Sequence, residues 1–325
     1  MKKKALSVLL SLFLFAASSC SKPVYSVSDY EKTMSYRNGF TILQWTDIHL
    51  GVESDTVKVQ EVLDEELKDC SASLGRNPDL IVITGDTFLN ATKGIVNEFF
   101  DYLDSKDIPF AFTYGNHDFQ GSYANDYIGK VIESKKNSVF VDYPEDDLQG
   151  RANYYIDLKE GEATKYRLFI LDSNNYYQDG FDIHYDIIHE DQLAHMDAIV
   201  KEKGKVPSLA FYHIPVYEFA DAYKEYQEGK IEGNGENEEK VCYGYKRTDA
   251  FSRMKEDGVI GMFCGHDHIN NSTLLYQDVL LSYGMKSTYE IYNDKVGYSL
   301  IQLHGQSQLS LGDVTKAVIG EGEQK

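Results

Sequence analysis

The sequence predicts an α/β fold, specifically a four-layer α/β/β/α sandwich of two mixed sheets flanked by helices. Two observations predict it. In the first half of the chain, short apolar strands alternate with amphipathic helices, which is typical of βαβ units and a buried parallel sheet. In the second half, apolar strands follow one another at short spacing with turn residues between them, which indicates antiparallel pairing. A chain of 325 residues is long enough to bury a substantial core.

The first half contains three predicted strands and two predicted helices. The strands cover residues 40–45, 80–83 and 109–113. The longer helix covers residues 56–74, where Val59, Leu63, Leu67, Cys70 and Leu74 recur at helical spacing along one side. The second helix covers residues 95–103.

The second half contains further short strands around one helix. We expect strands at residues 153–158, 167–171, 209–212 and 259–264, and a helix at 189–201. Residues 272–276, 279–283 and 297–303 are predicted to form an antiparallel meander. The Gly- and Glu-rich stretch from Gly229 to Glu239 is predicted to be a surface loop. Cys70 and Cys264 lie in apolar patterns and are expected to be small buried hydrophobic residues.

The N-terminus has the composition of an export signal. Three lysines precede a short apolar run, and small residues then lead to Cys20. Residues 1–20 are therefore predicted to be a lipoprotein signal peptide, residues 21–38 a polar tether, and residues 39–325 the folded domain. A lipid on Cys20 would make the protein an exported, membrane-anchored lipoprotein on a periplasmic or cell-surface face. The alternative is ordinary cleavage near Ala17, with Cys20 incidental.

The charge of the chain restricts its partners. Asp and Glu number 52 against 32 Lys and Arg, which gives a formal net charge of -20. Proteins that bind nucleic acid through phosphate contacts normally carry a basic surface, so we expect no stable nucleic-acid partner. The acidity is typical of a soluble surface. It also means that an anionic substrate would be repelled unless cations offset the charge locally.

Polar residues of the metal-ligand type follow five apolar strands. These segments read Asp47-Ile48-His49, Gly85-Asp86, Gly115-Asn116-His117-Asp118, His213 and Gly265-His266-Asp267-His268. Ligands of open α/β sheets bind outside the carboxyl ends of the strands, so the five segments are expected to converge at one rim. Nitrogen and oxygen ligands without thiolate suit Fe, Mn or Zn, and a carboxylate can bridge two such ions. Each segment alone is weak evidence, whereas five in order are specific.

These segments resemble the motif set of the calcineurin-like metallophosphoesterase superfamily, which reads DxH, GD, GNH(D/E), H and GHxH. Within it, the chain is most similar to the purple-acid-phosphatase-like branch. The stretches that carry this resemblance are ILQWTDIHLG, NPDLIVITGD, YGNHD, LDSN, DQL, YHIPVYEF, GENEEKV and FCGHDHINN. The resemblance runs from about residue 40 to residue 303 and implies a phosphoesterase fold and a two-metal site.

The resemblance also implies a role for each residue of the motifs. It assigns one metal to Asp47, His49, Asp86 and His268, and a second metal to Asp86, Asn116, His213 and His266. A metal-bound water or hydroxide would attack phosphorus. His117 would protonate the leaving oxygen, and Asp118 would orient or charge it. One departure from true purple acid phosphatases is Leu89, which stands where they carry a tyrosine ligand, so their ferric-tyrosinate colour is not expected.

Three functions remain open at this stage. The first is metal-dependent hydrolysis of phosphate monoesters, with a phosphorylated small molecule or lipid as substrate. The second is a phosphodiesterase that acts on nucleotides or lipid head groups. The third is a non-catalytic binding lipoprotein, which the presence of all seven ligand types and His117 disfavours.

Overall fold

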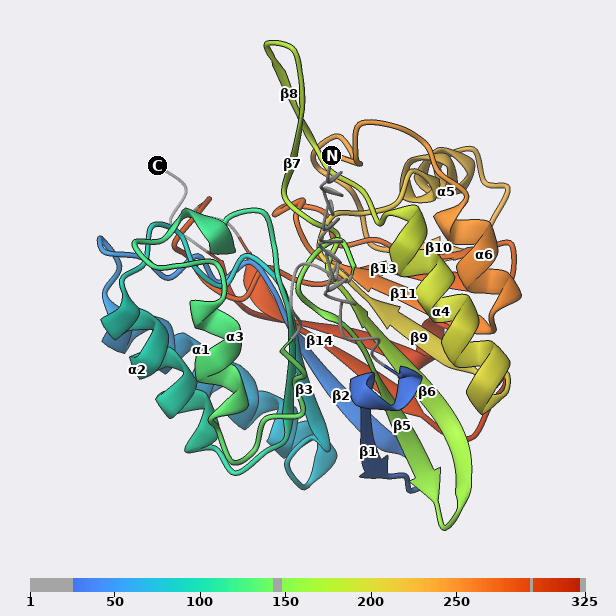
Figure 1. The fold of residues 1–325 in the computed structure, drawn as a ribbon, viewed down its shortest axis with the longest axis horizontal. Helices are drawn as coiled ribbons and strands as arrows, with labels where there is room; N and C mark the ends of the chain where they lie inside the picture. Colours follow the sequence, from blue (N-terminus) through green and yellow to red (C-terminus); the bar gives the residue numbers. More distant parts are fainter. Residues whose placement is uncertain (1–25, 143–147, 293–294, 322–325) are drawn as a thin grey trace, which may run out of the picture.

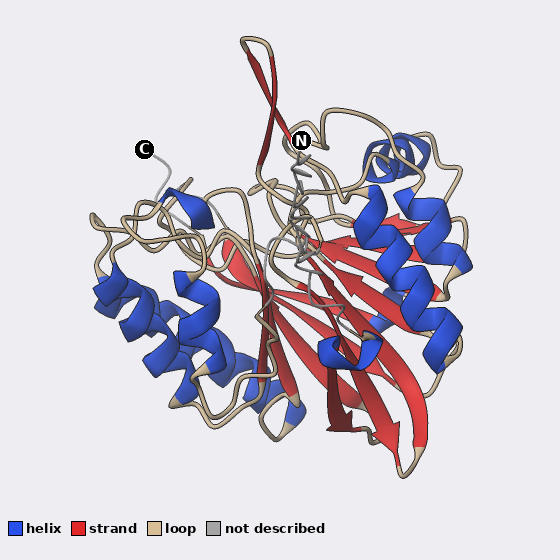
Figure 2. Cartoon of the chain, in the orientation of Figure 1, coloured by secondary structure: helices blue, strands red, loops and turns tan. Residues whose placement is uncertain are grey.

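A computed structural model describes residues 26–142, 148–292 and 295–321 of the chain. Two β-sheets pack face to face, and each carries helices on its outer side (Figure 1; Figure 2). The predicted four-layer sandwich is therefore confirmed.

The smaller sheet has five strands in the order β15-β14-β2-β3-β4. Strands β2, β3 and β4 run parallel to one another. Strand β14 is antiparallel to its two neighbours, β2 and β15. The strands are β2 (Phe40–Trp45), β3 (Leu80–Thr84), β4 (Phe110–Thr113), β14 (Val296–Leu303) and β15 (Val314–Gly320). The helices on its outer side are α1 (Thr56–Leu74), α2 (Lys93–Asp104) and α3 (Tyr127–Glu133).

The larger sheet has eight strands in the order β1-β5-β6-β9-β11-β13-β12-β10. They are β1 (Glu31–Ser35), β5 (Asn153–Glu160), β6 (Ala163–Leu171), β9 (Ser208–Phe211), β10 (Gly233–Asn234), β11 (Val259–Cys264), β12 (Thr273–Tyr276) and β13 (Val279–Tyr283). Its outer helices are α4 (Glu190–Lys203), α5 (Glu218–Gln227) and α6 (Ala250–Glu256). The remaining elements are the hairpin β7 (Tyr176–Asp179) and β8 (Asp182–Tyr185) and the 3₁₀ turns η1 (Val27–Tyr30), η2 (Asp118–Gln120) and η3 (Leu311–Asp313).

Helix α1 shows how local sequence determines an element. Asp55 caps its first turn by accepting a hydrogen bond from the Lys58 N–H at 3.3 Å. Gly75 ends it in the left-handed conformation, with φ of 67°, which glycine adopts without steric cost. The stripe that includes Val59 and Leu63 is buried against the sheet. The helix has the predicted bounds for these reasons.

Polar contacts join the two sheets across the core. The Tyr154 hydroxyl of β5 contacts both the N–H and the carbonyl of Phe112 in β4, at 3.0 and 3.1 Å. The Gln44 side chain of β2 donates to the Cys264 carbonyl at 3.1 Å, where β11 ends. These buried bonds fix the relative position of the sheets, and so bring the carboxyl ends of β2, β3, β4, β9 and β11 to one rim.

The predicted tether is wrong for its second half. Residues 31–35 form β1, which pairs in parallel with β5 and places Glu31 opposite Tyr155. Tyr30 and Tyr36, on either side of this strand, are buried. The segment looked like a tether because only these two aromatic side chains anchor it, while the residues between them are half-exposed or exposed.

The predicted meander is wrong for its third strand. β12 and β13 pair antiparallel, with Tyr276 opposite Val279. The chain then crosses to the other sheet, where β14 pairs with β2. β14 is buried along almost its whole length, so its apolar run suits either sheet and does not identify its partner.

Two sequence predictions lie outside the described residues: the signal peptide at residues 1–20 and lipidation at Cys20. Within the part of the chain that the structure describes, no helix combines the length and apolar character needed to cross a bilayer.

Candidate metal centre

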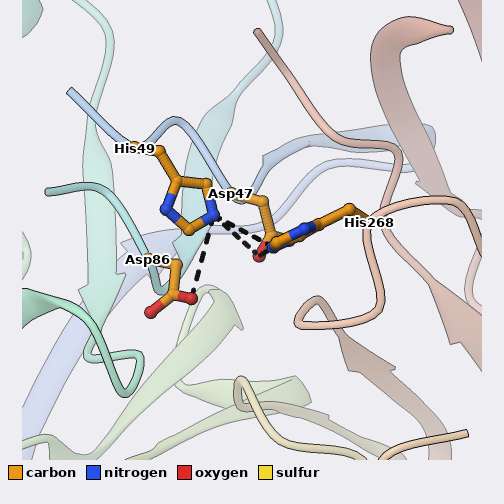
Figure 3. A group of neighbouring side chains, drawn as sticks. All are labelled: Asp47, His49, Asp86 and His268. Atoms are coloured by element: carbon orange, nitrogen blue, oxygen red, sulfur yellow. Dashed lines mark hydrogen bonds and ion pairs between the residues drawn. The ribbon is translucent and has the colours of Figure 1, made fainter. Parts of the chain in front are cut away.

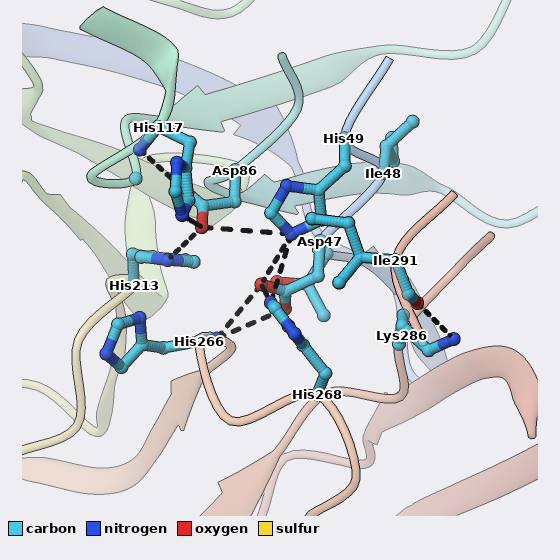
Figure 4. Close-up of polar contacts among 12 residues, drawn as sticks. Asp47, Ile48, His49, Asp86, His117, His213, His266, His268, Lys286 and Ile291 are labelled. Atoms are coloured by element: carbon cyan, nitrogen blue, oxygen red, sulfur yellow. Dashed lines mark hydrogen bonds and ion pairs between the residues drawn. The ribbon is translucent and has the colours of Figure 1, made fainter. Parts of the chain in front are cut away.

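The loops that follow five strands place seven predicted ligands at one rim of the sandwich. Figure 4 labels all of these ligands except Asn116. Three of these loops follow β2, β3 and β4 of the smaller sheet, and two follow β9 and β11 of the larger sheet. The site is therefore shared between both sheets. All of the seven side chains except His268 are buried.

The first cluster consists of Asp47, His49, Asp86 and His268 (Figure 3). The Nε2 atom of His49 lies 3.8 Å from one oxygen of Asp47 and 3.8 Å from one oxygen of Asp86. The Nε2 atoms of His49 and His268 are 3.0 Å apart, and His268 Nε2 is 3.4 Å from Asp47. Two carboxylates and two imidazoles that face one point can hold a divalent ion.

The second cluster consists of Asp86, His213 and His266, with Asn116 beside it. Oδ2 of Asp86 approaches Nε2 of His213 to 3.1 Å. Four buried ligand atoms meet here: Oδ2 of Asp86, Oδ1 of Asn116, Nε2 of His213 and Nε2 of His266. Among the described residues, the only contact of hydrogen-bond length that they make is the Asp86–His213 contact within the cluster itself. Buried polar atoms are almost always paired, so four such atoms without a partner outside the cluster fit a metal ion.

Surrounding groups orient the ligands. The Thr84 carbonyl accepts a hydrogen bond from Nδ1 of His213 at 2.8 Å, which turns Nε2 of the ring towards Asp86. The Asp47 carboxylate accepts one from the Thr46 hydroxyl at 2.8 Å and another from the His266 N–H at 3.1 Å. Such contacts to atoms behind the ligands are typical of metal sites.

The backbone at the site is strained. Asp47, His49, Asp86 and His266 all have positive φ, between 49° and 78°. Residues with a side chain rarely adopt this conformation, and the cost is of the order of 1 kcal/mol each. Strain of this kind persists where the surrounding structure enforces it, and it aims four of the seven candidate ligands at the same rim.

A glycine makes room for the shared carboxylate. A Cβ atom at Gly115 would lie 2.2 Å from Oδ1 of Asp86 and 2.3 Å from its backbone nitrogen. Any larger residue at this position would therefore displace Asp86. The same oxygen accepts a hydrogen bond from the His117 N–H at 2.8 Å, which fixes the carboxylate between the two clusters.

The charges of the site favour ionised carboxylates. Burial opposes ionisation of Asp47, but hydrogen bonds from His268 and His49 hold its pKa well below the usual value. Burial likewise opposes ionisation of Asp86, and the nearby His213 outweighs it and lowers the pKa of Asp86. Burial disfavours a charged His213, yet Asp86 raises the pKa of His213 to about 10. Burial lowers the pKa of His266 to about 3, which leaves it a neutral ligand.

His117 and Asp118 have different surroundings. Nε2 of His117 lies 4.0 Å from Oδ2 of Asp86, and its Nδ1 contacts the Gln120 side chain at 2.9 Å. The buried Asp118 carboxylate instead accepts hydrogen bonds from the N–H groups of Phe88 and Gly115, both at 2.8 Å. Gln120, and not Asp118, therefore contacts the His117 ring, while Asp118 joins the loops after β3 and β4. The structure does not support orientation of His117 by a hydrogen bond to Asp118, and an electrostatic role of Asp118 stays a prediction.

Sequence patterns missed two residues that contact the site. The Tyr176 hydroxyl of β7 accepts a hydrogen bond from Nδ2 of Asn116 at 3.0 Å. The Tyr185 ring of β8 packs edge-on against the His266 ring, with centroids 4.2 Å apart. Both belong to a hairpin that extends well beyond the rest of the domain (Figure 1). The two hairpin strands are exposed and lack the alternation of apolar and polar residues that identifies a half-buried strand, so the sequence pattern did not predict them.

Lys286, which comes after His268 in the sequence, fixes the shape of a loop beside the first cluster. Nζ of Lys286 donates to the Ile291 carbonyl at 2.9 Å and holds residues 286–292 in a compact loop (Figure 4). This loop places the Tyr292 ring 5.1 Å from the His268 ring.

A two-sheet sandwich with a buried, shared carboxylate between two clusters of N/O ligands defines the class of dinuclear metal-dependent phosphoesterases. The comparisons agree. The family model of calcineurin-like phosphoesterases matches residues 40–270. The chain belongs to this family, and the prediction of a metal-dependent phosphoesterase is confirmed at this level.

Individual relatives are more distant. The chain is 27% identical to "Probable inactive purple acid phosphatase 29" of Arabidopsis thaliana, over 90% of this chain and 82% of that protein. It is 28% identical to "Phosphatase DCR2" of Saccharomyces cerevisiae, over 72% of this chain but only 45% of that protein. Among solved structures, a dimetal phosphatase from Danio rerio superposes with a TM-score of 0.58 at 12% identity, covering 88% of this chain and 97% of that one.

Proposed function

We propose that this protein hydrolyses phosphate monoesters with two bound metal ions, which are Fe, Mn or Zn. The observation that carries the proposal is the set of four buried ligand atoms around Asp86, which among the described residues have no hydrogen-bond partner outside the cluster, next to a second cluster that uses the same carboxylate. A bridging carboxylate between two N/O ligand sets suits two ions close together.

The two ions would supply Lewis-acid polarisation of the phosphoryl group and an acidified water molecule at neutral pH. Their charge also bears on substrate binding. The chain has a formal net charge of -20, which repels a phosphate ester. Two divalent ions held by the ionised carboxylates of Asp47 and Asp86 would still leave about two positive charges at this rim, and these would offset the repulsion where the phosphate must bind.

The protein supplies the proton donor for the leaving group. His117 lies beside Asp86, its side chain is 27% exposed, and it belongs to neither ligand cluster. The Gln120 contact at Nδ1 leaves Nε2 to face the rim. A side chain in this position can donate a proton to the departing oxygen, provided that the substrate brings this oxygen within hydrogen-bond reach.

We also propose that the protein acts outside the cytoplasm on a phosphorylated small molecule or lipid, held to the membrane by a lipid on Cys20, without a stable nucleic-acid partner. The support is the lysine-rich start, the short apolar run and the small residues before Cys20. Metabolic labelling with a radioactive fatty acid tests this. Label should enter the full-length chain and be lost in Cys20→Ala, whereas equal labelling of both would contradict the proposal.

The decisive assay is a panel of aryl monophosphates, bis-aryl phosphates and alkyl phosphates, measured with Mn, Fe, Zn and Mg. We expect monoesters to be hydrolysed fastest, with no turnover in the presence of a chelator. Faster hydrolysis of the bis-aryl ester would instead identify a phosphodiesterase. Absence of hydrolysis with all four metals, in protein shown to have bound two ions, would contradict the proposal.

A further inference from the structure

A pocket of about 430 Å³ lies beside the metal centre, between the β7–β8 hairpin and the loop that contains residues 243–245. Its volume is within the range of small-molecule sites. We call it the tyrosine pocket, and its lining residues are Tyr176, Ile183, His184, Tyr185, Tyr243, Gly244 and Tyr245. Four of these are tyrosines and none is acidic, so the pocket offers aromatic surface without adding negative charge. Tyr176 and Tyr185 also stack on each other, with ring centroids 5.9 Å apart.

Two walls of the tyrosine pocket touch candidate ligands of the second cluster. The Tyr185 ring meets the His266 ring at 4.2 Å with an interplanar angle of 88°. The Tyr176 hydroxyl bonds to the Asn116 amide at 3.0 Å. Two walls of the pocket are therefore in direct contact with residues of the second cluster.

The pocket has fixed walls. The Tyr245 N–H donates to the Tyr185 carbonyl at 2.8 Å, and the rings of Tyr177 and Tyr245 stack at 3.9 Å with an angle of 13°. A Cβ atom at Gly244 would lie 2.2 Å from the Asp186 carbonyl, so only glycine allows this close approach. These contacts join the hairpin to the loop. The protein's own contacts therefore define the shape of the tyrosine pocket.

The chemistry of the walls favours a flat aromatic group. Tyrosine faces stack on planar rings, and the Ile183 side chain adds apolar surface. The Lys246 ammonium lies 5.2 Å from the centre of the Tyr245 ring, so one cation stands near the pocket. A small sugar or a glycerol group would leave these ring faces uncovered.

We propose that the tyrosine pocket binds the leaving group, and that the preferred substrates are phosphate esters of alcohols that carry a planar aromatic ring. This assignment rests on the proposed phosphoesterase function. A nucleoside and a simple aryl alcohol share the required chemistry, and the test below distinguishes them.

The test compares esters that differ only in their ring. Benzyl phosphate and cyclohexylmethyl phosphate have primary alkoxide leaving groups of similar basicity, and nucleoside 5′-phosphates are compared with ribose 5-phosphate in the same way. We expect a kcat/KM roughly 5- to 100-fold higher for the aromatic member of a pair, mainly through KM, which is the range that ring stacking supplies. A preference only in the benzyl pair assigns the pocket to aryl groups, and one in the nucleotide pair assigns it to a base.

Binding without turnover provides an independent measurement. The non-hydrolysable analogues 2-phenylethylphosphonate and 2-cyclohexylethylphosphonate are titrated into the metal-loaded protein by calorimetry. We expect the phenyl compound to bind more tightly by a similar factor. Tyr243→Leu and Tyr245→Leu should each remove most of this preference, whereas Tyr243→Phe should retain it. Tyr226→Leu is the control, because Tyr226 is a half-buried tyrosine on α5 that does not line the pocket.

The outcomes separate the two proposals. Equal binding of both phosphonates, or a preference that survives both leucine substitutions in folded protein, overturns the tyrosine pocket, even if both esters are hydrolysed. Tighter binding of the phenyl compound without hydrolysis of any ester supports the ring site and contradicts the phosphoesterase function.

Discussion

His117 lies beside Asp86 but belongs to neither ligand cluster, so a substitution at this residue can test the proposed proton donor separately from metal binding. We predict that His117→Ala retains its metal but loses about 10²–10⁴-fold in kcat, because a general acid contributes that much when the leaving oxygen is basic. The loss should be larger for alkyl esters than for nitrophenyl esters, whose leaving groups need no proton. Metal analysis and the two kcat values test this. Loss of metal, or an equal loss on both ester types, would make His117 a ligand or a structural residue.

Asp118 illustrates what a motif does not reveal about single residues. The GNHD segment identified His117 and Asp118 together, but neighbours in sequence need not face each other. The η2 turn directs the His117 ring towards Gln120 and buries the Asp118 carboxylate under two backbone N–H groups. Burial raises the pKa of Asp118 to about 8, and the nearby Asp86 adds to this. The identity of the site residues was therefore predictable from spacing, whereas the direction of each side chain was not.

Glu66 makes the stability of the fold depend on pH. Its side chain on α1 is fully buried, with the Trp45 side chain as a polar neighbour. Burial raises the pKa of Glu66 well above its usual value of 4.5. The folded state therefore binds more protons than the unfolded state above about pH 4.5, and the free energy of unfolding falls as the pH rises.

We predict that Glu66→Gln abolishes this decline, because an amide does not ionise. At pH 8 the variant should be more stable than the native protein, because the native fold must either keep a buried carboxyl protonated or bury its charge. The difference should grow by about 1.4 kcal/mol for each pH unit above 4.5 over which the folded carboxyl stays protonated, and it should shrink towards pH 5. Urea unfolding across this range measures it. Glu65→Gln, at the exposed neighbouring position, is the control and should change little. A difference that does not vary with pH would contradict the prediction.

The loops after β3 and β4 form a single unit through Gly115. We predict that Gly115→Ala loses metal at both clusters, because the added methyl group would stand 2.2 Å from Oδ1 of the shared Asp86. The matched control is Gly94→Ala in α2, where the nearest atom to the new Cβ would be 3.6 Å away. Alanine is favoured over glycine inside a helix, so this control should keep its metal and gain up to about 1 kcal/mol of stability. Two metals per chain in Gly115→Ala would contradict the close approach of these loops.

Among the helices and strands, the sequence predicted the features that depend on residues nearby in the chain, such as helix bounds. It missed the features that depend on residues far away in the chain, such as the partner of a strand. α1 has the predicted bounds because its cap, its apolar stripe and its terminal glycine are all local. β13 and β14 were also recognisable as strands, but they belong to different sheets. Both are buried on two faces, so their composition does not distinguish between partners.

The whole molecule should be stabilised by its metals. An ion that binds only the folded state stabilises it by about 2.7 kcal/mol when present at 100 times its dissociation constant. For a domain of this size we expect removal of both metals by a chelator to lower the Tm by roughly 5–10 °C. The Tm should then rise with the logarithm of added metal concentration. Asp86→Ala, which lacks the shared ligand, should show no such dependence; a Tm that responds to metal equally in both proteins would place the binding site elsewhere.

If Cys20 carries a lipid, the strand β1 would limit the distance between the folded domain and the membrane. β1 and its preceding turn are fixed to the larger sheet, where Lys203 bonds to Ser28 and pairs with Glu31, each at 3.0 Å. With a lipid on Cys20, the segment that connects Cys20 to Ser26 could span at most about 20 Å, the length of a fully extended chain. That is less than the roughly 30 Å thickness of a bilayer's hydrocarbon core. The folded domain would then stay close against the membrane surface.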